Sequence, residues 1–203
     1  MSEIQVVKRD GVKEPLDLEK MHKVVMFACE DIAGVSASEV ELKSHIQFYD
    51  GIASEEIQET LIKAASDLIS EETPNYQWVA GNLVNYHLRK MVYGEFEPWH
   101  ILKVVEANVK NGFYDSALLE DYTKEEWDEI NNFIKHDRDF NIAFVGMEQF
   151  RGKYLVQNRV TGKHFETPQI AYILISATLF SAYPKETRLK YVKDYYDAIS
   201  NFD

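Results

Sequence analysis

The dipeptide Asp10-Gly11 is the feature that most limits how this chain can begin to fold. The two central residues of a tight hairpin turn adopt positive φ, and Asp-Gly accommodates that conformation well. The pair lies between two short runs rich in β-branched and apolar residues, 4–9 and 12–16. We therefore predict a β-hairpin over residues 4–16.

The rest of the chain carries helix signals. Asp17 is placed to cap a helix that ends at Gly34, Ser36 and Glu39 form a capping box, and Ser54 is placed to cap a third helix. Asp50-Gly51 separates the second helix from the third. Apolar residues at helical spacing and cap signals predict further helices at 76–93, 99–109, 144–154 and 167–183, and two more that begin at Thr123 (with Glu126) and at Pro184. A break is predicted at 94–98. Residues 155–162 are predicted to form a short strand and a turn. The predicted fold is mainly α with a small β element.

Composition excludes several classes of protein. The 203 residues carry a net charge of −12, which disfavours nucleic acid as a direct partner, and Cys29 is the only cysteine. A single thiol excludes an internal disulfide and a multi-cysteine zinc site. We see no signal peptide, and the longest uncharged run, 167–184, contains polar residues typical of a core helix and not of a membrane span. We therefore expect a cytoplasmic protein with no membrane contact.

Metal-binding and catalytic signals are weak. The two Glu-x-x-His pairs, Glu19/His22 and Glu97/His100, fit solvated helix surface better than a di-metal centre. Cys29 lies on an apolar helix face and is interpreted as a buried small hydrophobe. The run 136–139 is interpreted as a charged helix cap or an ion-pair network. We expect no metal ligands and no catalytic residues in this chain.

A basic cluster near the N-terminus is the strongest functional signal from spacing. Lys8 and Arg9 flank the predicted turn, Lys20 lies in the first turn of the following helix, and Lys90 lies on a half-apolar helix face. Cations that meet at helix N-termini suit a polyphosphate, because the unpaired N–H groups add to their charge. The cluster predicts an anion pocket, although lysines on such faces also extend to solvent.

Several longer stretches of the sequence share motifs with a known family: 7–11, 14–20, 44–51, 74–77, 87–90, 93–98, 119–123, 152–159 and 186–192. They resemble the ATP-cone and the helical segment that follows it in class Ia ribonucleotide reductase large subunits. The resemblance covers essentially the whole chain. It implies an ATP-cone over residues 1–95, with a small β-cap on a four-helix bundle. It also implies a helical segment over 96–203 that precedes a catalytic α/β barrel, which would lie outside this chain.

The same resemblance implies a site for ATP or dATP with magnesium, acting as an allosteric effector, and no redox cofactor. Lys8, Arg9, Lys20 and Lys90 match phosphate ligands, and Glu14 and Asp17 match positions near the base. The remaining implied positions are Pro15, Leu16, Leu18 and Glu19 in the segment around the nucleotide, and Ser54, Ile57 and Gln58 in a second wall. Gln58 stands where some relatives have a histidine, which puts inhibition by dATP in doubt more than ATP binding.

The implied partners are the remainder of the large subunit, a second large subunit, and a small subunit that carries a metal-radical centre. The family's redox cysteines cannot be here, so we expect this portion of a ribonucleoside-diphosphate reductase to be inactive alone. It would be either a truncated chain or a natural fragment of a split subunit. Two other interpretations stay open: a cone-bearing transcription regulator, which the missing zinc cysteines disfavour, and a degenerate cone that serves only as a helical scaffold. Exposed aromatic residues in the second half would predict self-association.

Overall fold

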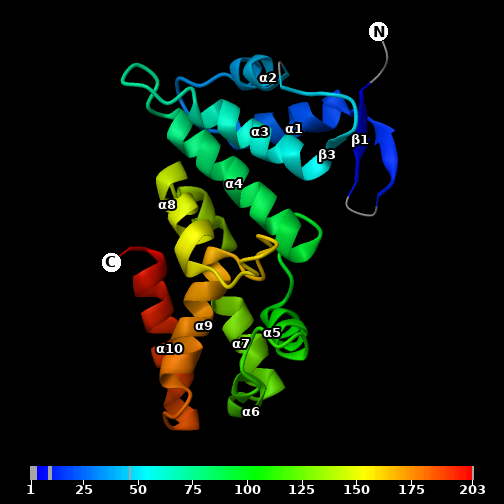
Figure 1. Cartoon of the computed structure of the whole chain (residues 1–203). Coiled ribbons are helices and arrows are strands. Elements are labelled where there is room, and N and C mark those ends of the chain that lie inside the picture. Colours follow the sequence, from blue (N-terminus) through cyan, green and yellow to red (C-terminus); the bar gives the residue numbers. More distant parts are fainter. Residues whose placement is uncertain (1–3, 9–10, 46, 203) are drawn as a thin grey trace. The chain divides into compact units, whose positions relative to one another are not determined.

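Two compact units make up the chain, and each is described by itself. The computed structural model describes residues 4–8, 11–45 and 47–202. The first unit comprises Met1–His87 and Phe140–Gln149, and the second comprises Leu88–Asp139 and Phe150–Asp203. The elements can be followed from blue to red in Figure 1.

A small sheet opens the first unit. Strand β1 (Gln5–Val7) pairs antiparallel with β2 (Lys13–Pro15) and parallel with β3 (Ile52–Ala53), which gives the order β2-β1-β3. Gly11 in the turn has φ +83°, a conformation that glycine adopts without strain. The predicted hairpin strands are confirmed, while Asp10 of the turn lies outside the described residues. Strand β3 was not predicted.

Helices pack around the apolar interior of this unit. They are α1 (Leu18–Cys29), α2 (Ala37–His45), α3 (Ser54–Ser66), α4 (Tyr76–Tyr93), whose last residues belong to the second unit, and α8 (Phe144–Gln149). Val25, Val40, Leu61 and Leu83 have no exposed surface and form the centre of the core. Figure 1 shows α1 to α4 as the blue to green helices beside the sheet. The mainly helical fold with a small β-cap agrees with the prediction.

Three helix boundaries of this unit differ from those predicted. Helix α8 ends at Gln149, and the predicted residues 150–154 form a π-helical turn instead. Helix α1 ends at Cys29 with Glu30 as its C-cap, and Gly34 (φ +74°) belongs to the following turn. Ser54 does not cap α3: Ala53 holds the cap position and Ser54 is the first helical residue. Because Ala53 lacks a side-chain acceptor, the Glu56 carboxylate satisfies this end of the helix by accepting from the Ala53 backbone N–H at 3.1 Å.

The second unit is helical. Its helices are α5 (Ile101–Lys110), α6 (Ala117–Asp121), α7 (Lys124–Phe133), α9 (Pro168–Phe180) and α10 (Lys185–Ser200), with a π-helical turn over Phe150–Tyr154. Trp127, Ile130, Ile170 and Tyr196 are buried at its core. Helix α9 ends three residues before the predicted position, and α5 begins two residues later than predicted because His100 is its N-cap. Residues 155–162 form a turn closed by the isolated bridge Gln157–His164.

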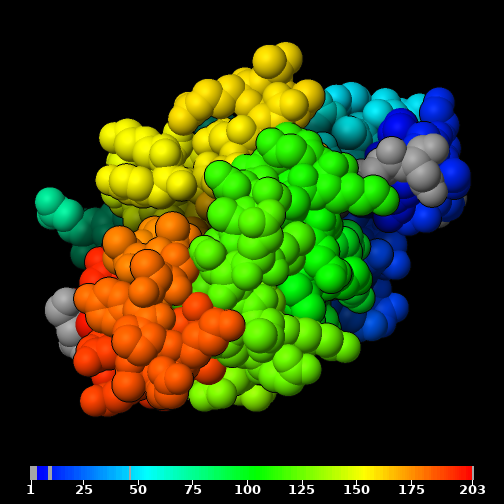
Figure 2. All heavy atoms as spheres, turned by 90° about the horizontal axis from the view of Figure 1, so that it is seen from below, coloured from blue at the N-terminus to red at the C-terminus, as the bar shows by residue number. Residues whose placement is uncertain are grey.

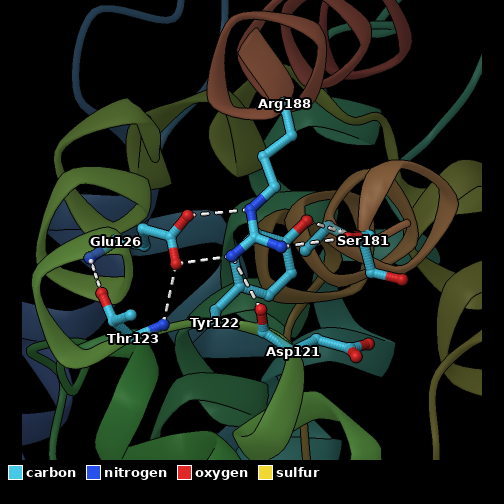
Figure 3. A network of polar contacts seen from close by, with 7 residues as sticks. Asp121, Tyr122, Thr123, Glu126, Ser181 and Arg188 are labelled. Carbon is cyan, nitrogen blue, oxygen red and sulfur yellow. Dashed lines mark hydrogen bonds and ion pairs between the residues drawn. The ribbon is translucent and has the colours of Figure 1, made fainter. Parts of the chain in front are cut away.

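A buried arginine fixes α10 to the junction of α6 and α7 (Figure 3). Arg188 is 3% exposed and donates from Nε and Nη2 to the Glu126 carboxylate at 2.8 and 2.6 Å. Its remaining donors reach the carbonyls of Ser181 and Asp121, and its guanidinium lies over the Tyr122 ring. The predicted capping box of Thr123 with Glu126 is also present, so Glu126 serves both contacts.

Arg138 and Asp197 form an ion pair at 3.0 Å, so the ion-pair interpretation of the run 136–139 is confirmed in part. The run itself begins a 3₁₀ turn, His136–Asn141. Among the described residues no helix is long and apolar enough to cross a bilayer. In Figure 2 the orange turn between α9 and α10 forms part of the surface of the second unit.

Candidate functional site

The register of the small sheet brings three of the predicted site residues close together, with Glu14 opposite Val6 and not opposite Lys8. Val6 pairs with Glu14, and Val7 pairs with Ala53, so Lys8 and Ser54 lie next to each other, each one residue beyond the paired positions. The Lys8 ammonium forms an ion pair with the Glu14 carboxylate at 2.6 Å, and both side chains are partly exposed. The cationic end of β1 is therefore already paired with a carboxylate.

The segment from Pro15 to Lys20 lies at the other end of β1. The Leu16 N–H donates to the Ile4 carbonyl at 2.8 Å and continues the hairpin by one bond. Asp17 is the N-cap of α1, as predicted, and its carboxylate accepts from the Lys20 N–H at 2.8 Å. The Lys20 side chain is exposed, and its amine has no partner among the described residues. Asp17 thus holds the helix start, and Lys20 extends into solvent.

The remaining residues of this segment lie at the surface. Leu18 is 49% exposed, and Pro15 is also exposed. Glu19 forms an i,i+4 ion pair with Lys23 at 2.9 Å, which places it along the solvent face of α1. None of these three side chains belongs to the core, so they are available to a ligand.

The first turns of α3 form the second predicted wall. Ser54 and Gln58 are partly exposed, while Ile57 is 6% exposed and packs into the core. Glu56, which the sequence analysis did not consider, accepts from the Ala53 N–H and from the Tyr49 hydroxyl, and both bonds lower its pKa. Its negative charge lies in the first turn of α3 and competes there with an incoming anion.

Two predicted phosphate ligands stand apart from this group. Arg9 lies outside the described residues. Lys90 is a partly exposed residue of α4 that belongs to the second unit, so it is described apart from the other residues of the site.

A buried histidine near Gln58 was missed. His87 on α4 is 1% exposed, and its Nε2 lies 3.4 Å from the Glu59 carboxylate, one residue after Gln58. A histidine in a half-apolar helix gives no sequence signal that separates a core position from a functional one. The contact places an ionisable pair beside the wall that Gln58 belongs to.

The chemistry of this surface is that of an anion site with competing carboxylates. The two helix starts lie at opposite ends of β1, whose three residues span about 10 Å. That span is short enough for one nucleotide to reach both. Lys8 and Lys20 supply charge, and a phosphate that binds Lys8 shares its ammonium with Glu14 or replaces that carboxylate.

The described residues contain no group of three potential metal ligands. His22 pairs with Glu41 at 2.6 Å and His100 lies 3.3 Å from Asp128, so each histidine of the two Glu-x-x-His pairs has a different carboxylate beside it. Asp17 and Glu14 are carboxylates of the kind that bind magnesium, but both already have a partner here. A magnesium ion at this surface would therefore depend on the phosphates that it accompanies.

Cys29 is partly exposed and not fully buried as expected. Burial and the Glu41 charge raise the pKa of its thiol to about 11. The thiol is protonated at neutral pH, which disfavours nucleophilic or redox use.

Comparison with known proteins assigns residues 4–91 to the ATP cone domain family. The chain is 53% identical over 98% of its length to the ribonucleoside-diphosphate reductase subunit alpha of Haemophilus influenzae, and 54% identical over 97% of its length to the corresponding subunit 1 alpha of Escherichia coli. It is 39% identical over 98% of its length to the subunit alpha of Enterobacteria phage T4. The chain spans about a quarter (26%) of the length of each of these relatives.

Proposed function

Because residues 4–91 are an ATP-cone domain and the whole chain is similar to the N-terminal region of ribonucleoside-diphosphate reductase alpha subunits, we propose that it is the regulatory, nucleotide-binding portion of such a subunit. The ligand is ATP or dATP, accompanied by magnesium. The observation that carries this proposal is the cone match over residues that include Lys8 to Lys90, supported by the sheet register that aligns Lys8 with Ser54.

The proposed site comprises three parts. The Lys8-Arg9 pair, Lys20 and Lys90 bind the phosphates. The segment from Glu14 to Lys20 surrounds the nucleotide, with Glu14 and Asp17 near the base. Ser54, Ile57 and Gln58 form the second wall. Binding of phosphate to Lys8 weakens its ion pair with Glu14. Gln58 hydrogen-bonds but cannot become cationic, so we propose that ATP binding is retained and inhibition by dATP is weakened.

The cone acts by shifting a population. A nucleotide changes the activity of a complete reductase only if it binds two quaternary arrangements with different affinity. We propose that these arrangements involve the remainder of the alpha subunit, a second alpha subunit and the metal-radical small subunit. The reduction itself requires cysteines that residues 1–203 do not supply, so this portion has no catalytic residue in the proposed scheme.

Two observations favour the alternative of a helical scaffold that binds nothing. The Lys8–Glu14 ion pair at 2.6 Å and the Glu56 carboxylate at the start of α3 both reduce the attraction for an anion. In that case the cone would contribute only packing surface. Titration with nucleotide separates the two functions.

The proposed site is tested by the affinity for Mg-ATP of variants with Lys8→Ala and Lys20→Ala. Loss of a charge-assisted contact costs about 1.5–3 kcal/mol, so we expect affinity to fall about ten- to a hundredfold in each variant. Lys63→Ala is the matched control, because Lys63 is an exposed lysine of the same unit whose partner, Asp67, lies at the C-terminal end of α3, outside the proposed site. Unchanged affinity in both site variants would contradict the assignment.

A further inference from the structure

Gly81 marks a very close approach of two backbone segments within the first unit. A Cβ atom at this position of α4 would lie 2.4 Å from the Ile142 carbonyl oxygen and 3.1 Å from the Phe144 backbone nitrogen. Both are backbone atoms, so an alanine could not be accommodated by rotating a side chain. Glycine at position 81 is what allows residues 142–144 to lie directly against α4.

Helix α1 holds the same segment through an aromatic contact. The Phe27 ring meets the Phe140 ring edge to face at 5.4 Å, and it also contacts Tyr86 of α4 at 6.4 Å. The Asn82 amide donates to the Ala28 carbonyl at 3.1 Å and ties the two helices together beside this contact. Residues 140–144 are therefore anchored on both α1 and α4.

Helix α1 also carries the proposed nucleotide residues. Phe27 follows Lys20 by seven residues, which is two helical turns, or about 10 Å, on the same face of the helix. A helix of this length moves as a rigid body, so a shift at the Lys20 end displaces Phe27 and the ring packed on it. Packed contacts of this kind change between discrete arrangements and do not deform gradually.

The anchored segment continues into an irregular helix. After α8 (Phe144–Gln149) the chain forms the π-helical turn Phe150–Tyr154, and the change from α to π coincides with the end of the first unit. Single π turns are rare and are frequent at functional sites, where an altered hydrogen-bond pattern changes the path of the helix. This turn is the point at which a displacement of α8 passes into the chain of the second unit.

We propose that residues 140–149 are a coupling segment that reports the nucleotide state of the cone to the polypeptide that follows it. The proposal rests on the proposed nucleotide binding and adds the route by which it acts. The nucleotide shifts α1 against α4, the Gly81 and Phe27 contacts move the segment, and the π turn at 150–154 takes up the change. Residues 140–149 thus act as part of the cone, although they lie beyond the 4–91 match.

Hydrogen exchange of the chain with and without Mg-ATP tests this route. In the wild type, Mg-ATP should slow exchange in 140–154 by about fivefold or more, in addition to any protection around 8–20. In Gly81→Ala the segment should exchange faster without nucleotide, and Mg-ATP should no longer change its exchange. The affinity of this variant for Mg-ATP should change by no more than the coupling that is lost, about fivefold, because the proposed ligands are all kept.

Met26→Ala is the matched control. Met26 lies next to Phe27 on α1 but is 50% exposed, so this substitution should preserve the response. Phe140→Ala, which removes the ring contact with Phe27 and introduces no clash, should also abolish the response and replaces Gly81→Ala if that variant does not fold.

Two outcomes overturn the proposal in distinguishable ways. If the wild type binds Mg-ATP but exchange in 140–154 does not change, or if Gly81→Ala responds as the wild type does, the coupling route is wrong and the nucleotide site stands. If calorimetry shows no binding of Mg-ATP to the wild type, the proposed function fails and the coupling fails with it.

Discussion

Asp139 is a carboxylic acid that has no exposed surface. Its Oδ1 accepts from the Gln169 amide at 3.0 Å, while its Oδ2 has no hydrogen-bond partner among the described residues. Gln169 in turn accepts from the Tyr196 hydroxyl at 2.6 Å. Burial raises the pKa of Asp139 from 3.8 to about 7, so the native state keeps this proton where the unfolded chain has lost it.

Asp139→Asn should therefore stabilise the protein more at pH 8 than at pH 5. Between pH 3.8 and about 7 the native state binds more protons than the unfolded state, so this residue makes the free energy of unfolding fall as pH rises. The amide has no such proton to lose, and we expect the difference in unfolding free energy between variant and wild type to grow by about 1–3 kcal/mol from pH 5 to pH 8. Urea denaturation at several pH values measures it.

His136 acts in the opposite direction and has to be separated from Asp139. Burial and the Arg89 charge lower the pKa of His136 from 6.5 to about 4, so its contribution to stability rises with pH between these values. The wild-type profile contains both slopes, whereas the difference between wild type and Asp139→Asn contains only the aspartate. A difference that does not change with pH would show that Asp139 is ionised in the native state.

At the scale of elements, Arg188 is the contact on which α10 depends. Arg188→Met leaves the partly buried Glu126 carboxylate and the carbonyls of Asp121 and Ser181 without their donor. Removal of one partner of a buried ion pair costs about 3–5 kcal/mol, and we expect a loss of unfolding free energy in this range. Lys190→Met, at an exposed position of the same helix, should leave stability within about 0.5 kcal/mol.

Arg188→Lys distinguishes charge from geometry in this network. Lysine keeps the positive charge but cannot bind Glu126 and both carbonyls in the planar arrangement of a guanidinium. We expect an intermediate loss of stability. A lysine variant as stable as the wild type would mean that charge alone holds α10 in place.

The elements that could be predicted from sequence are those with local signals. Asp17 and Thr123 cap helices by accepting hydrogen bonds from residues three positions away, and the turn requires the positive φ of Gly11. Each of these features therefore depends only on a few neighbouring residues. Strand β3 has only two residues and exists because it pairs with β1 some 45 positions earlier. Ser54 looked like a cap because its residue type favours that role, but the strand pairing extends to Ala53 and moves the cap by one residue.

The parts of the site that could not be predicted depend on contacts between residues far apart in the sequence. The proximity of Lys8, Glu14 and Ser54 depends on strand register, which no local pattern contains. The family resemblance predicted that these residues belong to the site, but it did not predict the ion pair between Lys8 and Glu14. The close approach of Gly81 to Ile142 and the complete burial of Asp139 likewise depend on contacts between distant segments.

At the scale of the whole molecule, an aromatic and aliphatic strip on α9 and α10 remains at the surface. Leu179 is 54% exposed, Tyr183 45% and Tyr191 43%, and the rings of Phe180, Tyr183 and Tyr191 contact one another. Contiguous apolar surface of this kind favours association. We expect light scattering to show an average mass that rises with concentration and a smaller rise in Leu179→Glu. A constant monomer mass in both proteins would contradict this expectation.

The central claim is that this chain binds an adenine nucleotide through its ATP-cone. Calorimetric titration of residues 1–203 with Mg-ATP, and separately with Mg-dATP, tests it most directly. We predict saturable binding of at least one of the two nucleotides with a dissociation constant in the micromolar range, which corresponds to a binding free energy of about −8 kcal/mol. No heat with either nucleotide, together with an unchanged melting temperature, would contradict the claim and leave the cone as a scaffold.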